Sequence, residues 1–227
     1  MTEMEITVPD EVPVMTLPNT AFFPQALMPL HIFEPRYQQM LRDALASNRL
    51  FAVAGLNPKA TSLDQAEPPH RIAALGIIRA CQKSDDGTSN LLLQGLCRVA
   101  ITDIVTEEPY RRIRIQALAS EPGATDQEND GLRREVTRLL SVKARLAHTD
   151  AREMMKFLKS VNDPEAFIDI AAFSLCESAA LKQRLLETLD VHSRLKLFGK
   201  QLKTDIEALK LQRKLQGHLP DDRVAAN

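Results

Sequence analysis

The stretch PVMTLPNTAFFPQALMPLHIFEPRY, residues 13–37, decides how the rest of this chain is interpreted. An apolar run over residues 12–17 predicts a short strand, and a second extended run over residues 27–33 contains Pro29. Because proline cannot donate a hydrogen bond to a neighbouring strand, Pro29 favours an edge position or a bulge. Glu34-Pro35 then predicts the start of a helix, since proline fits the first helical turn, where its missing N–H costs nothing.

The remainder of the first half has the period of strands. An Asp-Gly pair within Ser84-Asp85-Asp86-Gly87 predicts a hairpin turn, because glycine tolerates a positive φ. Gly95 is interpreted as a bulge or bend, and Arg98 as a structural residue that bonds carbonyl groups or Asp103. Six or seven short strands with one helix are typical of a small barrel-like sheet. The further strands are predicted over residues 50–56, 71–83, 88–94, 98–106 and 110–119.

Residues 120–131 are polar and include Pro122 and Gly123, so we interpret them as a linker. After this linker, apolar residues recur at helical spacing. Asp163 and Ser178 are predicted N-caps, and a last, long helix runs from Asp190 to Gly217. The predicted fold class is α+β, with a β-barrel domain over residues 10–120 and a helical bundle over residues 128–217.

Composition excludes several classes of protein. The formal net charge of the 227-residue chain is −1, which gives no global attraction to nucleic acid or membrane. No apolar run approaches the roughly 18 residues needed to span a bilayer, and the N-terminus lacks the pattern of a signal peptide. A cytoplasmic location and no membrane partner are therefore expected. The three cysteines match no disulfide framework and are interpreted as buried free thiols.

Motifs for catalysis or cofactor binding are missing from the sequence. Gly199-Lys200 lacks the upstream glycine of a phosphate-binding loop. Ser141 and Lys143 fall on a predicted helix with side chains about 200° apart, so they cannot form a catalytic pair. The five histidines show no metal-ligand spacing. We expect no cofactor, no metal and no enzymatic activity.

Several segments, taken in order, resemble the N-terminal substrate-binding domain of Lon proteases. They are residues 17–37, the run LGII at 75–78, the run LLQGLCRV at 92–99 with its Gly95 and Arg98, and Glu108-Pro109-Tyr110. The resemblance extends over about residues 11–215. Gln25 departs from it, because the family usually has glycine after the Phe-Pro pair.

The resemblance implies a PUA-like β-barrel with one inserted helix, followed by a helical bundle that ends in a long helix. It also implies a free-standing, non-catalytic module without ATPase or peptidase domains, which recognises unfolded polypeptide or a partner protein. A polypeptide receptor needs exposed apolar surface. The candidate peptide-binding residues are Phe22, Phe23, Pro24, Met28 and Tyr37; the alternative is that they belong to the core.

RNA binding is the second hypothesis, because the barrel type and the basic last helix would suit it. The chain has no tryptophan and two tyrosines, so aromatic side chains for base stacking are scarce, and a solvated helix face is favoured. A small-molecule enzyme with an unrecognised site is the third hypothesis. The basic residues of the last helix are Arg194, Lys196, Lys200, Lys203, Lys210, Arg213 and Lys214, against Asp205 and Glu207.

Overall fold

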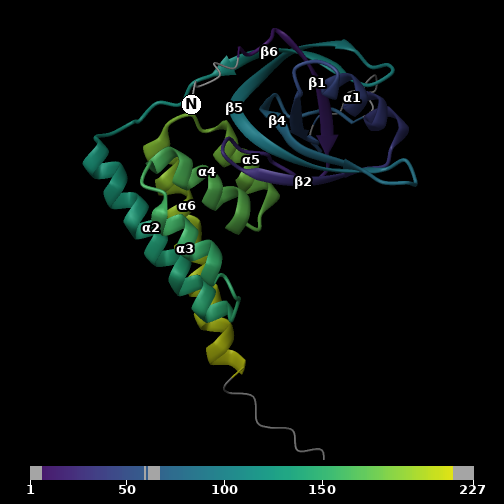
Figure 1. The fold of residues 1–227 in the computed structure, drawn as a ribbon. Coiled ribbons are helices and arrows are strands. Elements are labelled where there is room, and N and C mark those ends of the chain that lie inside the picture. The colour runs from purple at the N-terminus through teal and green to yellow at the C-terminus, as the bar shows by residue number, and fades with distance from the viewer. Residues whose placement is uncertain (1–6, 59, 61–66, 217–227) are drawn as a thin grey trace, which may run out of the picture. The chain divides into compact units, whose positions relative to one another are not determined.

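The computed structural model describes residues 7–58, 60 and 67–216, which form six strands and six helices (Figure 1). The chain divides into two compact units. The first contains Met1–Glu121 and Ile168–Asp190, and the second contains Pro122–Phe167 and Val191–Asn227. In chain order the elements are β1 (Glu11–Leu17), β2 (Leu27–Ile32), α1 (Pro35–Leu45), β3 (Leu50–Gly55), β4 (Ile72–Lys83), β5 (Ser89–Thr106), β6 (Arg112–Leu118), α2 (Asp126–Ala147), α3 (Arg152–Ser160), α4 (Pro164–Leu175), α5 (Ala179–Glu187) and α6 (Val191–Gln216).

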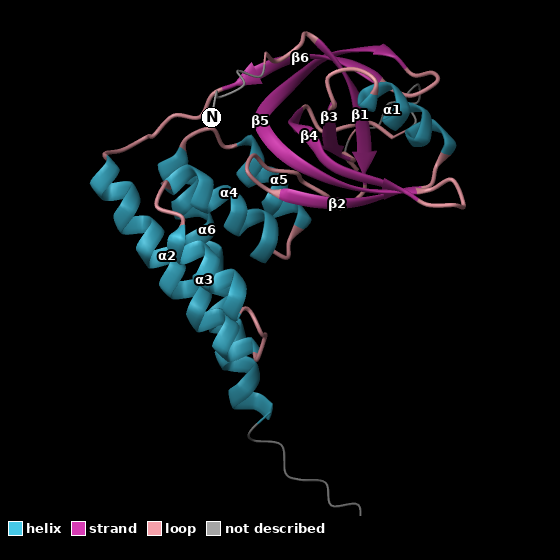
Figure 2. Cartoon of the chain, in the orientation of Figure 1, coloured by secondary structure: helices cyan, strands magenta, loops and turns pink. Residues whose placement is uncertain are grey.

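The sheet of the first unit closes on itself. Its strands follow the order β2-β5-β4-β3-β1-β6, and β6 also pairs with β5, so that five strands form a ring with β2 attached to β5 (Figure 2). Neighbouring strands are antiparallel except β1 and β3, which are parallel. Together with the helices, this sheet confirms the predicted α+β class.

The long strand β5 explains how one sheet can both close and carry an extra strand. Its first part pairs with β2 and its second part with β6, while β4 pairs with it along most of its length. The sequence predicted two strands here, over 88–94 and 98–106, whereas the structure has one strand of 18 residues. The register of β5 against β4 shifts beside Gly95, where a bulge or bend was predicted. This shift lets the strand bend without ending.

The interior of the ring is filled by alternate residues of its strands. Inward positions carry branched aliphatic side chains and small alanines, which pack tightly on a strongly curved sheet. This pattern matches the period of two that predicted the strands. The buried cluster is Val12, Val14, Leu50, Ala52, Ala54, Ala73, Leu75, Val99, Ile101, Ile113 and Ile115.

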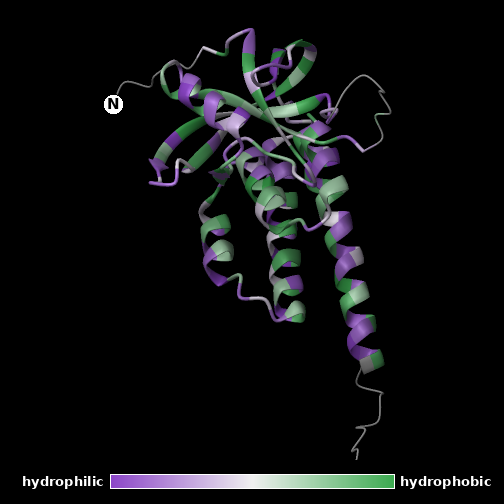
Figure 3. Ribbon diagram, turned by 90° about the vertical axis from the view of Figure 1, so that its right-hand side faces the viewer, coloured by the Kyte–Doolittle hydropathy of each residue, from purple (hydrophilic) through white to green (hydrophobic). Residues whose placement is uncertain are grey.

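The second unit is built around α2 and α6. Both helices bury apolar residues at helical spacing, and hydrophobic and hydrophilic stretches alternate along the long helix in Figure 3. Ion pairs join their polar sides: Lys143 Nζ lies 2.8 Å from Asp205 Oδ2, and Lys203 Nζ lies 2.8 Å from Glu135 Oε1. Among the helices that the structure describes, none has the length and apolar composition to cross a membrane.

The predicted linker over 120–131 is too long. Helix α2 begins at Asp126 because Thr125 and Glu128 form a capping box: the Thr125 hydroxyl accepts from the Glu128 N–H, and the Glu128 carboxylate accepts from the Thr125 N–H. These two bonds satisfy N–H groups that the first helical turn leaves unpaired.

The predicted domain limits also change. Residues 168–190, which we placed in the helical bundle of 128–217, belong to the same compact unit as the sheet. The predicted N-caps of this region are confirmed, since Asp163 accepts from the Ala166 N–H at 2.7 Å and Ser178 from the Leu181 N–H at 3.2 Å. The predicted helix end at Gly217 lies outside the described residues. Of the cysteines, Cys176 is buried, Cys97 is half-buried and Cys81 is exposed, so the expectation of burial is wrong for Cys81.

Candidate functional site

The five predicted peptide-binding residues lie in the interior of the first unit. Phe22 and Phe23 are 0% exposed, Met28 and Tyr37 are 6% exposed, and Pro24 is buried. The ring of Phe22 packs edge-on against Phe173 with centroids 6.2 Å apart, and the Tyr37 hydroxyl points to the Thr16 carbonyl at 3.4 Å. In this structure these residues do not line an open groove. Their burial supports the alternative that they are core.

An exposed apolar surface lies directly beside them on β2. Alternate residues of this strand face outward: Leu27, Pro29 and His31, followed by Phe33 just past the strand end. Leu27 is 52% exposed and Phe33 is 62% exposed. The His31 ring stacks on Phe33 with centroids 6.0 Å apart, and the register sets Pro29 opposite the half-buried Leu92 of β5. We call Leu27, Pro29, His31 and Phe33 the β2 stripe.

The β2 stripe lies on a strand that has a free edge. Among the described strands β2 pairs with β5 alone, which confirms the edge position that Pro29 predicted. An edge strand offers backbone groups to which another extended chain can add. The stripe could have been predicted: once Pro29 is assigned to an edge, the alternation puts Met28 and Ile32 inside and Leu27 and Phe33 outside.

A buried ion pair fixes the helical segment of the first unit against the sheet. Arg98 of β5 is 1% exposed, and its two terminal nitrogens lie 2.6 and 2.7 Å from the carboxylate oxygens of Asp169. Its Nε donates to the Leu186 carbonyl at 3.0 Å. Arg98 was expected to bond carbonyl groups or Asp103, and the bond to a carbonyl is confirmed. Asp103 instead lies 3.5 Å from Arg114.

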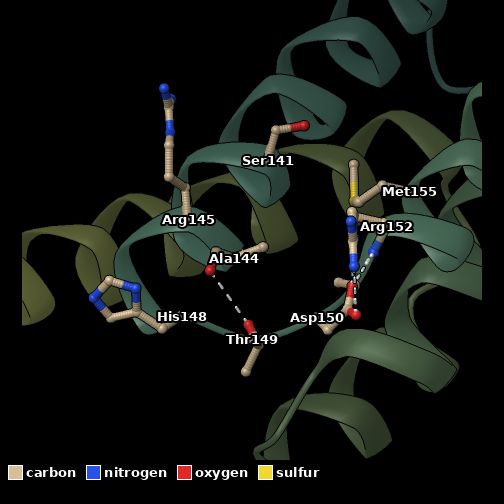
Figure 4. A pocket seen from close by; sticks show the side chains of 9 residues that line it. Ser141, Ala144, Arg145, His148, Thr149, Asp150, Arg152 and Met155 are labelled. Carbon is tan, nitrogen blue, oxygen red and sulfur yellow. Dashed lines mark hydrogen bonds and ion pairs between the residues drawn. The ribbon is translucent and has the colours of Figure 1, made fainter.

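The second unit has a pocket of about 520 Å³ where α2 turns into α3. Arg145, His148 and Arg152 line it, but Figure 4 shows that their side chains point in different directions rather than toward one another. Arg152 is already paired with Asp150 at 3.0 Å, and both side chains are largely exposed. This pocket therefore lacks a convergent set of groups that would indicate a site.

The basic residues of α6 are partly used inside their own unit. Arg194 is fully buried and lies 3.3 Å from Glu165, and Lys203 is paired with Glu135. Arg213 donates to the Leu146 carbonyl at 2.6 Å. Basic side chains that are paired within their own unit do not form a continuous cationic surface for phosphates. Within the residues that the structure describes, no three potential ligand side chains gather as a metal site would require.

Residues 11–204 match the family model of the ATP-dependent protease La (LON) substrate-binding domain. The chain is 28% identical over 217 residues to the Lon protease of Desulfosudis oleivorans, a match that covers 94% of this chain and 26% of that protein. It is 29% identical over 218 residues to the Lon protease of Syntrophus aciditrophicus, which covers 94% of this chain and 28% of that protein. The chain thus spans about a quarter of the length of these relatives.

Two solved structures have a similar fold. The N-terminal domain of the Mycobacterium avium complex Lon protease superposes with a TM-score of 0.66 at 21% identity, over 85% of this chain and 98% of that chain. The Lon N-terminal domain protein from Xanthomonas campestris superposes with a TM-score of 0.58 at 21% identity, over 82% of this chain and 95% of that chain. At this identity the likeness concerns the fold.

Proposed function

Because the chain belongs to the family of Lon substrate-binding domains, we propose that it is a non-catalytic module that binds unfolded polypeptide. A folded partner protein that presents an extended segment is the second candidate occupant. The family match concerns the domain that handles substrates, so neither ATP hydrolysis nor peptide cleavage is part of the proposal. We retain the PUA-like type of barrel as part of this proposal, since the closed ring of strands is compatible with it.

The observation that supports polypeptide binding is the β2 stripe. Unfolded chains differ from folded ones in presenting apolar side chains and unpaired backbone groups together. The stripe offers both complements: exposed Leu27 and Phe33 for side chains, and the free edge of β2 for backbone hydrogen bonds. Fully burying a leucine or phenylalanine side chain contributes about 1.5–3 kcal/mol.

Binding of a labelled, permanently unfolded polypeptide tests the proposal. We expect saturable binding that persists at raised salt, because apolar burial and backbone pairing are weakly screened. Leu27→Ser and Phe33→Ser should each weaken binding by about tenfold, the equivalent of roughly 1.4 kcal/mol. Val105→Ser is the matched control, since Val105 is also an exposed apolar residue of the first unit, at 41%, but lies outside the stripe.

Three outcomes would contradict the proposal. The wild-type chain could fail to bind any non-native polypeptide. The control variant could lose as much affinity as the two stripe variants, which would move binding away from β2. Short RNA could displace the polypeptide in a strongly salt-dependent manner, which would indicate counterion release and favour an RNA ligand.

A further inference from the structure

The backbone of β2 points alternately toward β5 and toward the free edge. In an antiparallel pair, residues that exchange hydrogen bonds with the neighbouring strand alternate with residues whose N–H and C=O groups point away from it. Immediately before β2, the Gly95 N–H donates to the Ala26 carbonyl at 2.9 Å, so the backbone of Ala26 faces β5. The same direction follows by alternation for Met28, Leu30 and Ile32. The residues between them therefore turn their backbone groups to the free edge.

Pro29 removes one hydrogen-bond donor from the middle of this free edge. The residues of β2 that face the edge are Leu27, Pro29 and His31. Each of them offers a carbonyl oxygen, but only Leu27 and His31 offer an N–H, because proline has none. In the part of the chain that the structure describes, no backbone hydrogen bond outside the strand pairing involves these three residues. The edge therefore presents acceptors along its length and a gap in its donors.

The side chains of the same residues form the β2 stripe, so backbone and side-chain contacts are linked. In a sheet, the side chains of residues directly opposite each other on neighbouring strands lie on the same face. Every second side chain of a strand added to β2 would therefore pack on the stripe. The stripe is ordered in advance at one end, since His31 Nδ1 lies 2.9 Å from Asn90 Oδ1 and the His31 ring stacks on Phe33.

From this edge we propose that a client segment with apolar side chains at alternate positions adds to β2 as one further strand, and that Pro29 keeps this strand releasable. The added strand bonds to the edge on both sides of Pro29, at Leu27 and His31. The client carbonyl that faces Pro29 finds no N–H there, whichever direction the added strand takes, because the missing donor belongs to β2. This inference rests on the proposed polypeptide-binding function and names the class of segment that the β2 stripe accepts.

A second copy of the chain suits this edge less well than a client does. Two β2 edges paired with each other would contain two prolines, and so two missing donors over the same short length. Proline on an edge strand is one of the features that oppose pairing between copies of a protein. A client segment without proline leaves a single gap, and it continues the existing β2–β5 pairing by one strand.

Two short peptides of identical composition test the strand addition, one with apolar residues at alternate positions and one with them at helical spacing. We expect the alternating peptide to bind about tenfold more tightly. N-methyl groups placed singly along it should weaken binding about fivefold at every second position, where the peptide N–H faces β2. Equal binding of the two peptides, or an N-methyl effect without a period of two residues, would overturn the strand addition.

The positions that N-methylation affects also give the direction of the added strand. If they are the apolar positions, the strand is antiparallel to β2, because residues directly opposite each other then exchange both bonds. If they are the positions between, the strand is parallel, because its bonds go to residues on either side of the opposite one. Either result supports the addition of a strand to the edge.

The variant Pro29→Val tests the role of the proline. Valine supplies the missing N–H and keeps an apolar side chain that suits a strand. We expect the alternating peptide to bind about fivefold more tightly, mainly through slower dissociation, because one more client carbonyl is paired. Pro18→Val is the matched control, since Pro18 is also an exposed proline of the first unit but lies outside β2. An unchanged dissociation rate in Pro29→Val would overturn the role of Pro29.

The outcome for strand addition is separable from that for the proposed function. An unfolded polypeptide may bind in a manner that Leu27→Ser and Phe33→Ser weaken, while the two short peptides bind equally. That combination would count against strand addition alone. If the unfolded polypeptide and both short peptides fail to bind, the proposed function itself is wrong. The peptide series uses the wild-type chain, so neither conclusion depends on the stability of a variant at Pro29.

Discussion

Gln25 has a backbone conformation that residues with a side chain rarely adopt. Its φ is 62°, in the left-handed region, where a Cβ costs roughly 1–2 kcal/mol and glycine has no such penalty. The Gln25 N–H donates to the Gly95 carbonyl at 3.0 Å, so the turn is held in place although the side chain is exposed. The resemblance to the Lon N-terminal domain implies glycine at this position, and the structure shows that the turn keeps the geometry suited to glycine.

We therefore predict that Gln25→Gly stabilises the protein by about 0.5–1 kcal/mol. The substitution relieves the backbone strain, and the greater conformational entropy of glycine in the unfolded chain offsets part of that gain. The unfolding midpoint in urea measures this change. Gln39→Gly in α1 is the matched control and should destabilise by about 1 kcal/mol, since glycine is unfavourable inside a helix. A lower midpoint for Gln25→Gly would contradict the argument.

His70 should make stability depend on pH. Burial lowers its pKa in the folded state, so between the two pKa values the unfolded chain binds more protons than the folded one. Stability from this group is present at pH 7.5 and is lost as the pH falls through the unfolded value of about 6.5. We expect the unfolding free energy to drop more between pH 7.5 and 5.5 for the wild-type chain than for His70→Gln, as measured by urea denaturation.

At the scale of elements, the pair between Arg98 and Asp169 ties β5 to α4. Removing one partner leaves a buried charge uncompensated, so Asp169→Ala should destabilise the protein by about 3–5 kcal/mol. Replacing both residues, as Arg98→Met with Asp169→Leu, should cost much less than the sum of the two single changes. Urea denaturation of Arg98→Met, Asp169→Leu and the double variant, each compared with the wild-type chain, gives this coupling. Additive losses would show that the pair is not what fixes α4.

Local sequence patterns predicted which elements form, and long-range contacts decided what they do. The strands were predictable because their inward residues alternate, and the Thr125–Glu128 spacing alone could have placed the start of α2. The partner of Arg98 was not predictable, because Asp169 lies 71 positions away on a helix whose other faces are equally apolar. Phe22 and Phe23 looked like a binding surface for the same reason: their burial depends on distant residues such as Phe173.

At the scale of the whole molecule, the units do not follow the order of the sequence. A period of 3.6 residues identifies α4 and α5 as helices but not the body against which each packs. The structure assigns residues 168–190 to the unit of the sheet, where Arg98 donates to the Leu186 carbonyl and the Ile72 carbonyl accepts from Gln183. The predicted division into 10–120 and 128–217 differs from the compact units there, because it assumed that each unit is continuous in sequence.

This discontinuity makes a prediction about shortened chains. A chain of residues 1–121 lacks Asp169 and Leu186, so Arg98 loses its ion pair and the carbonyl that its Nε bonds. The buried Phe22 also loses the ring of Phe173, so we expect this shortened chain to remain unfolded or aggregate. If residues 122–167 are replaced by a Gly/Ser linker of about 12 residues, which spans on the order of 20 Å, and the chain ends at Asp190, the first unit should fold. Dispersed amide resonances and a cooperative urea transition are the expected signs. Cooperative folding of residues 1–121 alone would show that the sheet is self-sufficient, and would restore the continuous domain that the sequence predicted.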